Sequence, residues 1–244
     1  MGYDIENGIL TIKMPAFHQQ VLKNYPKYDF HQPSPETCND YRDFRNSCGH
    51  AQRAYLCHHA LLAFIEHGVV GCDVGSAGCV TPMCISLDIV GNNEIPEYGG
   101  VMQGVQIKGD ANDLSIFCDN SLSCVVSNHV LEHGNCNKLK GDETTEQKIA
   151  IGCDGSELIE LFRKHWLRVL VKGGYLVAIF PEEGAARKAN HSVFHQDKQH
   201  RHAIYANKFL DKVLIPLRDS GEVEIVEYDT FRNNFSCNMV LRKK

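Results

Sequence analysis

The sequence has no long apolar run and no basic region ahead of one. No stretch reaches the roughly 18 consecutive apolar residues that suggest a transmembrane helix, and the N-terminal M-G-Y-D-I-E-N-G has no resemblance to a secretory signal. We therefore expect a soluble, cytoplasmic protein with no membrane partner.

An excess of positive charge is also lacking. The 25 lysines and arginines are outnumbered by 30 acidic residues, which gives a formal net charge of −5, and the largest basic cluster is the terminal Arg242-Lys243-Lys244. Affinity for nucleic acid depends largely on cationic side chains that neutralise phosphates. The charge balance therefore argues against a nucleic-acid partner.

The eleven cysteines include no C-x-x-C pair. Their number is odd and no secretory signal accompanies them, so reduced thiols are expected rather than a disulfide framework. Without paired cysteines a structural zinc site built from thiolates has no support. We therefore expect none of the site residues to bind a metal.

The chain of 244 residues is long enough for one large α/β domain or two small ones. The first 35 residues are rich in proline and predict an extended arm with little regular structure. Apolar residues spaced by three and four then predict one or two helices that end at Gly68. We expect an N-terminal arm and helical cap over 1–67 and a main domain over 68–244, with an insertion of little helix at about 135–156.

Apolar runs and turn residues alternate through the main domain. They predict helices at 157–170, closed by Gly173-Gly174, and at about 207–219. The predicted strands are residues 69–74, 84–90, 105–108, 122–127, 175–180, 223–230 and 236–242. This alternation predicts a doubly wound, Rossmann-like α/β fold, with a seven-stranded and mostly parallel sheet and an antiparallel last strand at one end.

Residues 69–88 join two of these strands through a glycine turn. Gly75 and Gly78 allow the backbone to turn sharply and to approach a ligand closely. Asp88 is expected at the carboxyl end of the next strand, where a carboxylate can hydrogen-bond two ribose hydroxyls. The stretch suits a nucleotide-like ligand, although similar turns also occur without one.

Five motifs follow one another in a familiar order: D-V-G-S-A-G (73–78), L-D-I (87–89), G-D-A-N-D-L (109–114), D-N-S-L-S-C-V-V-S-N-H-V-L-E-H (119–133) and L-R-V-L-V-K-G-G-Y-L-V-A-I-F-P (167–181). Together they resemble the class I S-adenosylmethionine-dependent methyltransferases, and most of all the branch called methyltransferase type 11. The resemblance spans about residues 69–181. It implies S-adenosylmethionine as cofactor and methyl transfer as the activity, on a Rossmann-like methyltransferase fold.

The resemblance also implies positions for the cofactor. The glycine turn would lie against its methionine part, Asp88 would hold the ribose, Asp110 would face the adenine, and the end of strand 122–127 would face the methyl group. The residues assigned in this way are Asp73, Gly75, Ser76, Ala77, Asp88, Ile89, Asp110, Ala111, Ser127, Asn128 and His129.

The glycine turn departs from the family's D-x-G-x-G-x-G pattern, because Ala77 and Cys79 replace the second and third glycines. Pro82 also shortens any helix after the turn. A protein that binds S-adenosylmethionine or S-adenosylhomocysteine without catalysis is one alternative. A nicotinamide-dependent dehydrogenase is another, but it would require glycines where Ala77 and Val80 stand.

Histidines supply the candidate catalytic groups. A base is needed only when the acceptor must lose a proton, and His129, His133 and His195 are the candidates. The L-E-H ending that contains Glu132 and His133 can equally serve to fix the loop by hydrogen bonds. The histidine-rich loop 191–206 is open to three interpretations: a substrate-proximal loop, a plain surface loop or a metal site.

The chemical class of the acceptor is predicted from a motif that is absent and from the composition of the segments expected to line the pocket. The N/D-P-P-Y/F motif of enzymes that methylate amino groups of nucleic acids is replaced by Ser127-Asn128-His129-Val130. The arm, the 135–156 insertion and the histidine-rich loop are polar and poor in aromatic residues. We therefore expect a polar small-molecule or glycan-like acceptor.

Overall fold

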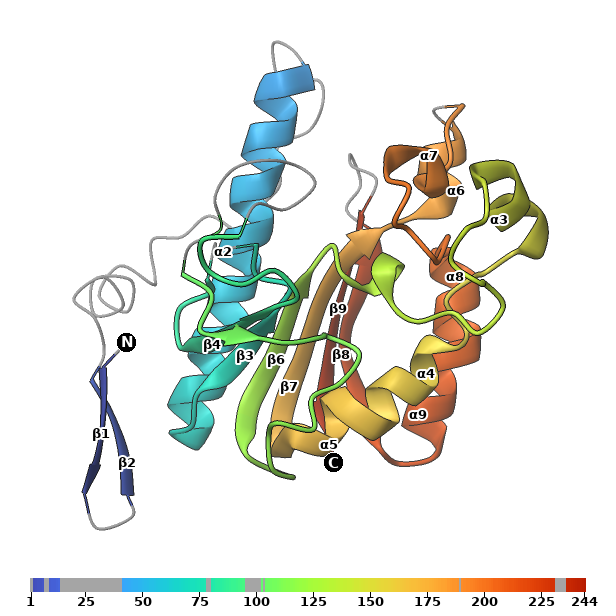
Figure 1. Cartoon of the computed structure of the whole chain (residues 1–244). Helices are drawn as coiled ribbons and strands as arrows, with labels where there is room; N and C mark the ends of the chain where they lie inside the picture. The colour runs from blue at the N-terminus through green and yellow to red at the C-terminus, as the bar shows by residue number, and fades with distance from the viewer. Residues whose placement is uncertain are drawn as a thin grey trace.

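The computed structural model describes residues 2–6, 9–13, 41–77, 80–94, 102, 104–188, 190–230 and 236–244. Most of them form one twisted sheet with helices on both faces (Figure 1). A separate two-stranded sheet is formed by β1 (Gly2–Glu6) and β2 (Ile9–Lys13). The arm predicted over the first 35 residues therefore contains regular structure here, while its residues 14–35 lie outside the described ones.

The large sheet has seven strands in the order β5-β4-β3-β6-β7-β9-β8. Its strands are β3 (Gly71–Val74), β4 (Cys84–Asp88), β5 (Ile107–Lys108), β6 (Leu122–Asn128), β7 (Leu170–Pro181), β8 (Val223–Thr230) and β9 (Ser236–Lys243). The strand β9 pairs antiparallel with both β7 and β8, whereas the other pairs are parallel. This arrangement confirms the predicted doubly wound, Rossmann-like α/β fold with a seven-stranded, mostly parallel sheet. The reversed strand lies second from the edge rather than at it.

One face of the sheet is covered by α2 (Tyr41–His67). Its Leu56, Ala60 and Ala63 are fully buried and pack against strand residues such as Val126 and Val177. The helix predicted to end at Gly68 is thus confirmed. Because α2 packs directly on β3, β6 and β7, it forms a layer of the main fold.

The other face is covered by two helices that each contain a π-helical turn. The first runs through α4 (Leu158–Leu161), η4 (Phe162–Trp166) and α5 (Leu167–Val169). The second runs through α8 (Ala206–Phe209), η5 (Leu210–Leu214) and α9 (Ile215–Asp219). Trp166 is fully buried in the core between them and the sheet, and its indole N–H donates to the Ala111 carbonyl at 2.7 Å.

Three local features differ from what the sequence predicts. The glycines at 173 and 174 do not close a helix but lie inside β7, because the chain becomes extended at Leu170, whose ψ is 139°. The insertion contains α3 (Thr145–Ile151), which begins at a capping box made by Thr144 and Gln147. The histidine-rich segment forms a short helix, α7 (Val193–Gln196), with Ser192 as its N-cap.

Two short helices lie at the edge of the sheet formed by the carboxyl ends of its parallel strands, one after β6 and one after β7. They are η3 (Leu131–His133), directly after β6, and α6 (Glu183–Lys188), directly after β7. In open α/β sheets this edge is where a crevice forms for a ligand. Among the described residues, no helix is long and apolar enough to cross a membrane.

Candidate functional site

The turn after β3 depends on glycine at position 75. Gly75 has a φ of +65°, and its N–H donates to the Leu87 carbonyl at 2.8 Å. A Cβ placed on Gly75 would overlap Val130 Cγ2, so the position excludes side chains on steric as well as conformational grounds. Glycine therefore brings the turn close to the chain segment that follows β6.

Asp88 closes this turn from the end of β4. Its Oδ2 accepts from the Ala77 N–H at 2.9 Å and its Oδ1 from the Val90 N–H at 3.0 Å. A carboxylate offers about four lone-pair positions, so two backbone donors leave lone pairs unused, on a residue that is itself 6% exposed. The neighbouring Ile89 is 66% exposed, which leaves an apolar side chain beside Asp88 for a ligand to cover.

Asp73 supports the turn from inside the protein. The side chain is fully buried, and its Oδ2 accepts from the Thr81 N–H at 2.7 Å and lies 3.6 Å from Arg53 Nη1. Arg53 also donates to the Ser76 carbonyl at 3.3 Å. Burial raises the pKa of Asp73, while the Arg53 charge and the Thr81 N–H oppose that rise. These contacts connect α2 to both ends of the loop between β3 and β4.

The segment after β5 places Asp110 and Ala111 differently from each other. Asp110 is exposed, and its Oδ1 accepts from the backbone and side-chain amides of Asn112, both at 2.8 Å. Ala111 is half-buried, with its carbonyl taken by Trp166. The segment is therefore held by its own turn and by the core, with the Asp110 side chain on the surface.

The end of β6 presents three polar residues at the middle of the sheet. Ser127 is fully buried and Asn128 is half-buried, and neither Ser127 Oγ nor Asn128 Oδ1 has a hydrogen-bond partner among the described residues. His129 follows with a φ of +57°. This backbone conformation is uncommon for residues other than glycine and often marks a functional site. Because β6 is next to β3, these residues are neighbours of the glycine turn.

His129 is held from both sides of its ring. Its Nδ1 lies 3.3 Å from Glu132 Oε1, and its Nε2 lies 3.2 Å from Ser236 Oγ and 3.5 Å from Gln52 Nε2. The side chain remains 39% exposed, so the ring can meet a ligand while its partners fix it. A carboxylate on one ring nitrogen orients a histidine for proton transfer at the other.

Glu132 lies under this histidine with 1% of its side chain exposed. Burial opposes ionisation, but the contact with His129 and the neighbouring His133 and His200 outweigh it, so the pKa of Glu132 lies below its usual range. Its main-chain carbonyl accepts from the N–H groups of Arg201 and His202, which ties η3 to the histidine-rich segment. Glu132 is therefore an ionised group buried between two chain segments.

The structure separates the histidines of the sequence into two groups. His133 packs edge-on against His200 with ring centroids 4.7 Å apart, and His200 Nε2 lies 3.9 Å from Glu132 Oε1. Burial lowers the pKa of His200 and of His202. His195 instead is exposed on α7, with its ring 5.1 Å from that of His191. Among the described residues, no hydrogen bond, ion pair or ring contact connects His195 with His129 or Glu132.

The candidate site thus has two halves on one edge of the sheet. The glycine-turn half consists of residues 75–77 and Asp88, and the histidine half consists of His129, Glu132, His133 and His200. Contributions from Gln52, Arg53 and Ser236 are not predicted by the sequence, because they come from α2 and β9 and carry no motif. The convergence of Glu132 with His200 is not predicted either, although the density of histidines was a partial signal.

Comparison with known proteins gives distant structural matches. No family model matches the chain, and no curated protein does. A magnesium protoporphyrin IX methyltransferase from Synechocystis with bound S-adenosylhomocysteine is 13% identical, with 93% of this chain and 96% of that chain covered and a TM-score of 0.47. A Burkholderia thailandensis 1,6-didemethyltoxoflavin-N1-methyltransferase is 11% identical, with coverages of 93% and 87% and a TM-score of 0.44. A methyltransferase from Archaeoglobus fulgidus is 16% identical, with coverages of 84% and 100% and a TM-score of 0.44.

Proposed function

We propose that this protein transfers a methyl group from S-adenosylmethionine to a polar small-molecule or glycan-like acceptor. One observation carries the proposal: Asp88 and the Gly75 turn lie on the same sheet edge as the exposed, fixed ring of His129. In this proposal the ribose hydroxyls donate to the unused lone pairs of Asp88, and the adenine packs over Ile89. The methionine part then lies along the turn, with its sulfur toward the end of β6.

The proposed reaction needs little covalent chemistry from the protein. The acceptor atom attacks the methyl carbon, the carbon–sulfur bond breaks, and its electron pair stays on sulfur to leave S-adenosylhomocysteine. When the acceptor is a hydroxyl, it displaces Ser236 Oγ and Gln52 from His129 Nε2 and passes its proton to that nitrogen, and Glu132 stabilises the resulting imidazolium from Nδ1. His129 is thus the proposed base and Glu132 its positioning residue.

Two alternative functions make different demands on the same edge. A dinucleotide carries a pyrophosphate, which is usually bound at a helix N-terminus after the glycine turn. Among described residues 75–77 and 80–83 no helix begins, whereas S-adenosylmethionine carries no phosphate to be bound. This favours the methyl donor over a nicotinamide cofactor. A protein that binds the donor without catalysis would need Asp88 but not His129.

Calorimetry with S-adenosylhomocysteine tests the proposal. We expect one ligand per chain and no heat with NAD at the same concentration. Absence of binding at millimolar S-adenosylhomocysteine would overturn the proposed cofactor. Methyl-labelled S-adenosylmethionine, offered with a panel of sugars and hydroxylated small molecules, then tests turnover. Cofactor binding with no labelled product from any of them would favour the non-catalytic alternative.

A further inference from the structure

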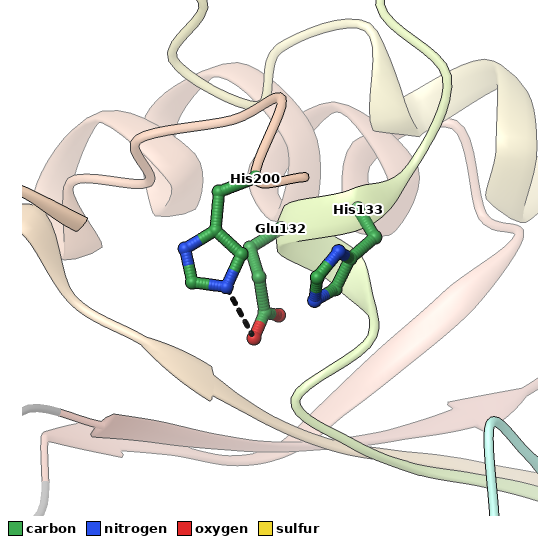
Figure 2. Close-up of side chains that lie close together, drawn as sticks. All are labelled: Glu132, His133 and His200. Carbon is green, nitrogen blue, oxygen red and sulfur yellow. Dashed lines mark ion pairs between the residues drawn. The ribbon is translucent and has the colours of Figure 1, made fainter. Parts of the chain in front are cut away.

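Glu132, His133 and His200 point toward one another from two separate chain segments (Figure 2). One ligand atom of each lies within 4.8 Å of those of the other two. Glu132 and His133 come from η3, directly after β6, whereas His200 belongs to the segment between α7 and α8. A carboxylate and two imidazoles are donors that first-row divalent metals bind.

The buried carboxylate lacks the partners that a structural role would supply. Both oxygens of Glu132 are without a hydrogen bond of good geometry among the described residues, although the side chain is 1% exposed and His129 Nδ1 lies 3.3 Å away. Leaving a buried carboxyl group unsatisfied is costly, because burial removes the water that would otherwise solvate its oxygens. The carboxylate therefore has capacity for a further cationic partner.

The tautomer of His200 turns a lone pair toward this carboxylate. His200 Nδ1 lies 2.8 Å from the Val193 carbonyl, and because a carbonyl oxygen can only accept, Nδ1 carries the proton. A neutral ring then presents an unprotonated Nε2, which lies 3.9 Å from Glu132 Oε1. Two electron-rich atoms that face each other repel, so the arrangement is stabilised either by a proton on Nε2 or by a metal ion between the two atoms. A backbone carbonyl on the far nitrogen is also the usual support of a metal-binding histidine.

We propose that Glu132, His133 and His200 form a binding site for a divalent transition-metal ion, with zinc as the best match. Two imidazoles and one carboxylate are the three protein ligands of one type of catalytic zinc site, whose fourth position is open to water or substrate. In the tetrahedral geometry of such a site two ligand atoms lie about 3.4 Å apart, so the three side chains must close by as much as about 1.4 Å when they bind the ion. His129 keeps its contact with the same carboxylate.

The position of the ion gives it a part in the proposed function, on which this step of the inference rests. The site follows β6 directly, on the edge where the methyl group is expected. A bound divalent ion supplies a Lewis acid that binds a hydroxyl oxygen and lowers its pKa. The acceptor class favoured by the site is therefore one with hydroxyl groups, such as a sugar.

Metal titration of the full chain tests the site. The protein is stripped with a chelator and titrated with Zn²⁺ by calorimetry and with Co²⁺ by absorption spectroscopy. We expect one ion per chain and a Co²⁺ spectrum with nitrogen and oxygen ligands. His133→Ala should weaken Zn²⁺ binding at least about 100-fold, whereas His191→Ala, which removes an exposed histidine, should not change it. Equal affinities in these two variants, or less than one ion per chain, would overturn the proposal.

Two further measurements distinguish the proposed metal site from zinc binding by cysteines and from the proposed function. The Sγ atoms of Cys136 and Cys153 lie 2.6 Å apart and could bind zinc themselves, so Cys136→Ser/Cys153→Ser must retain the site. Loss of zinc binding in that variant would assign the ion to the thiols and refute the site. Binding of S-adenosylhomocysteine is measured on the same samples. If the protein binds zinc but not S-adenosylhomocysteine, the metal site is supported and the proposed function is not. If it binds S-adenosylhomocysteine but not zinc, only the metal site is refuted.

Discussion

The two halves of the candidate site are built from very different distances along the chain. The glycine-turn half is closed within 14 residues, from Gly75 to Asp88, because the Gly75 N–H donates to the Leu87 carbonyl and the Ala77 N–H donates to the Asp88 carboxylate. The histidine half joins Gln52, Glu132, His200 and Ser236, which come from four separate segments. The first half is therefore set mainly by contacts within one short stretch, with additional support from Arg53 of α2, whereas the second is set by tertiary packing. Substitutions should affect the two halves in different ways.

The largest effect is expected where local geometry is strictest. Gly75→Ala places a Cβ at positive φ and against Val130, and we predict a loss of unfolding free energy on the order of 3 kcal/mol. Gly68→Ala is the matched control, because Gly68 has a φ of +67° but space for a Cβ among the described residues. It should cost about 1 kcal/mol. Chemical denaturation measures both, and equal losses would show that the Val130 contact is unimportant.

The next effect concerns ligand binding at the end of β4. Asp88→Ala removes the acceptor proposed for the ribose, and we predict a loss of S-adenosylhomocysteine affinity of about 1.5–3 kcal/mol, roughly 10- to 150-fold. Asp119→Ala removes an exposed carboxylate elsewhere and should leave the affinity unchanged. Calorimetry of both variants decides the question. An unchanged affinity in Asp88→Ala would mean that the end of β4 does not hold the ligand.

A smaller gain is expected from restoring a glycine to the turn. Ala77 has a φ of +48°, a region that favours glycine. We predict that Ala77→Gly raises the unfolding free energy by about 1 kcal/mol, because the backbone strain exceeds the entropy lost by the glycine in folding. Thermal or chemical unfolding would reveal it. Destabilisation instead would indicate that the alanine methyl group makes a contact that the strain does not outweigh.

The last effect concerns pH and the link between the turn and α2. Burial raises the pKa of Asp73 above its ordinary value of 3.8, so the folded state binds this proton more tightly than the unfolded state. The resulting stabilisation is complete below the unfolded pKa and is lost as the pH rises through the folded one. We predict that the free energy of unfolding falls less for Asp73→Asn than for the wild type as the pH rises above the unfolded pKa of about 4. Parallel slopes for the two proteins would contradict it.

The same contrast explains how much could be predicted from the sequence. The sheet, its reversed strand, the turn at Gly75 and the position of Asp88 depend on local patterns, and the sequence predicts them. It misses α3 and the early start of β7 at Leu170, because neither follows from apolar spacing. The buried state of His200 depends on its contacts with Glu132, which is far away in the sequence, and with Val193, which lies on α7. Histidine density alone could not distinguish it from the exposed His195.

The most direct test of the proposed function is a crystal structure of the complex with S-adenosylhomocysteine. We predict ribose hydroxyls within hydrogen-bond distance of Asp88, the adenine against Ile89, and the sulfur directed toward Asn128 and His129. Asp88 would keep at least one of its backbone contacts. A ligand bound elsewhere, or one whose sulfur points away from the end of β6, would contradict the proposed methyl transfer at this edge of the sheet.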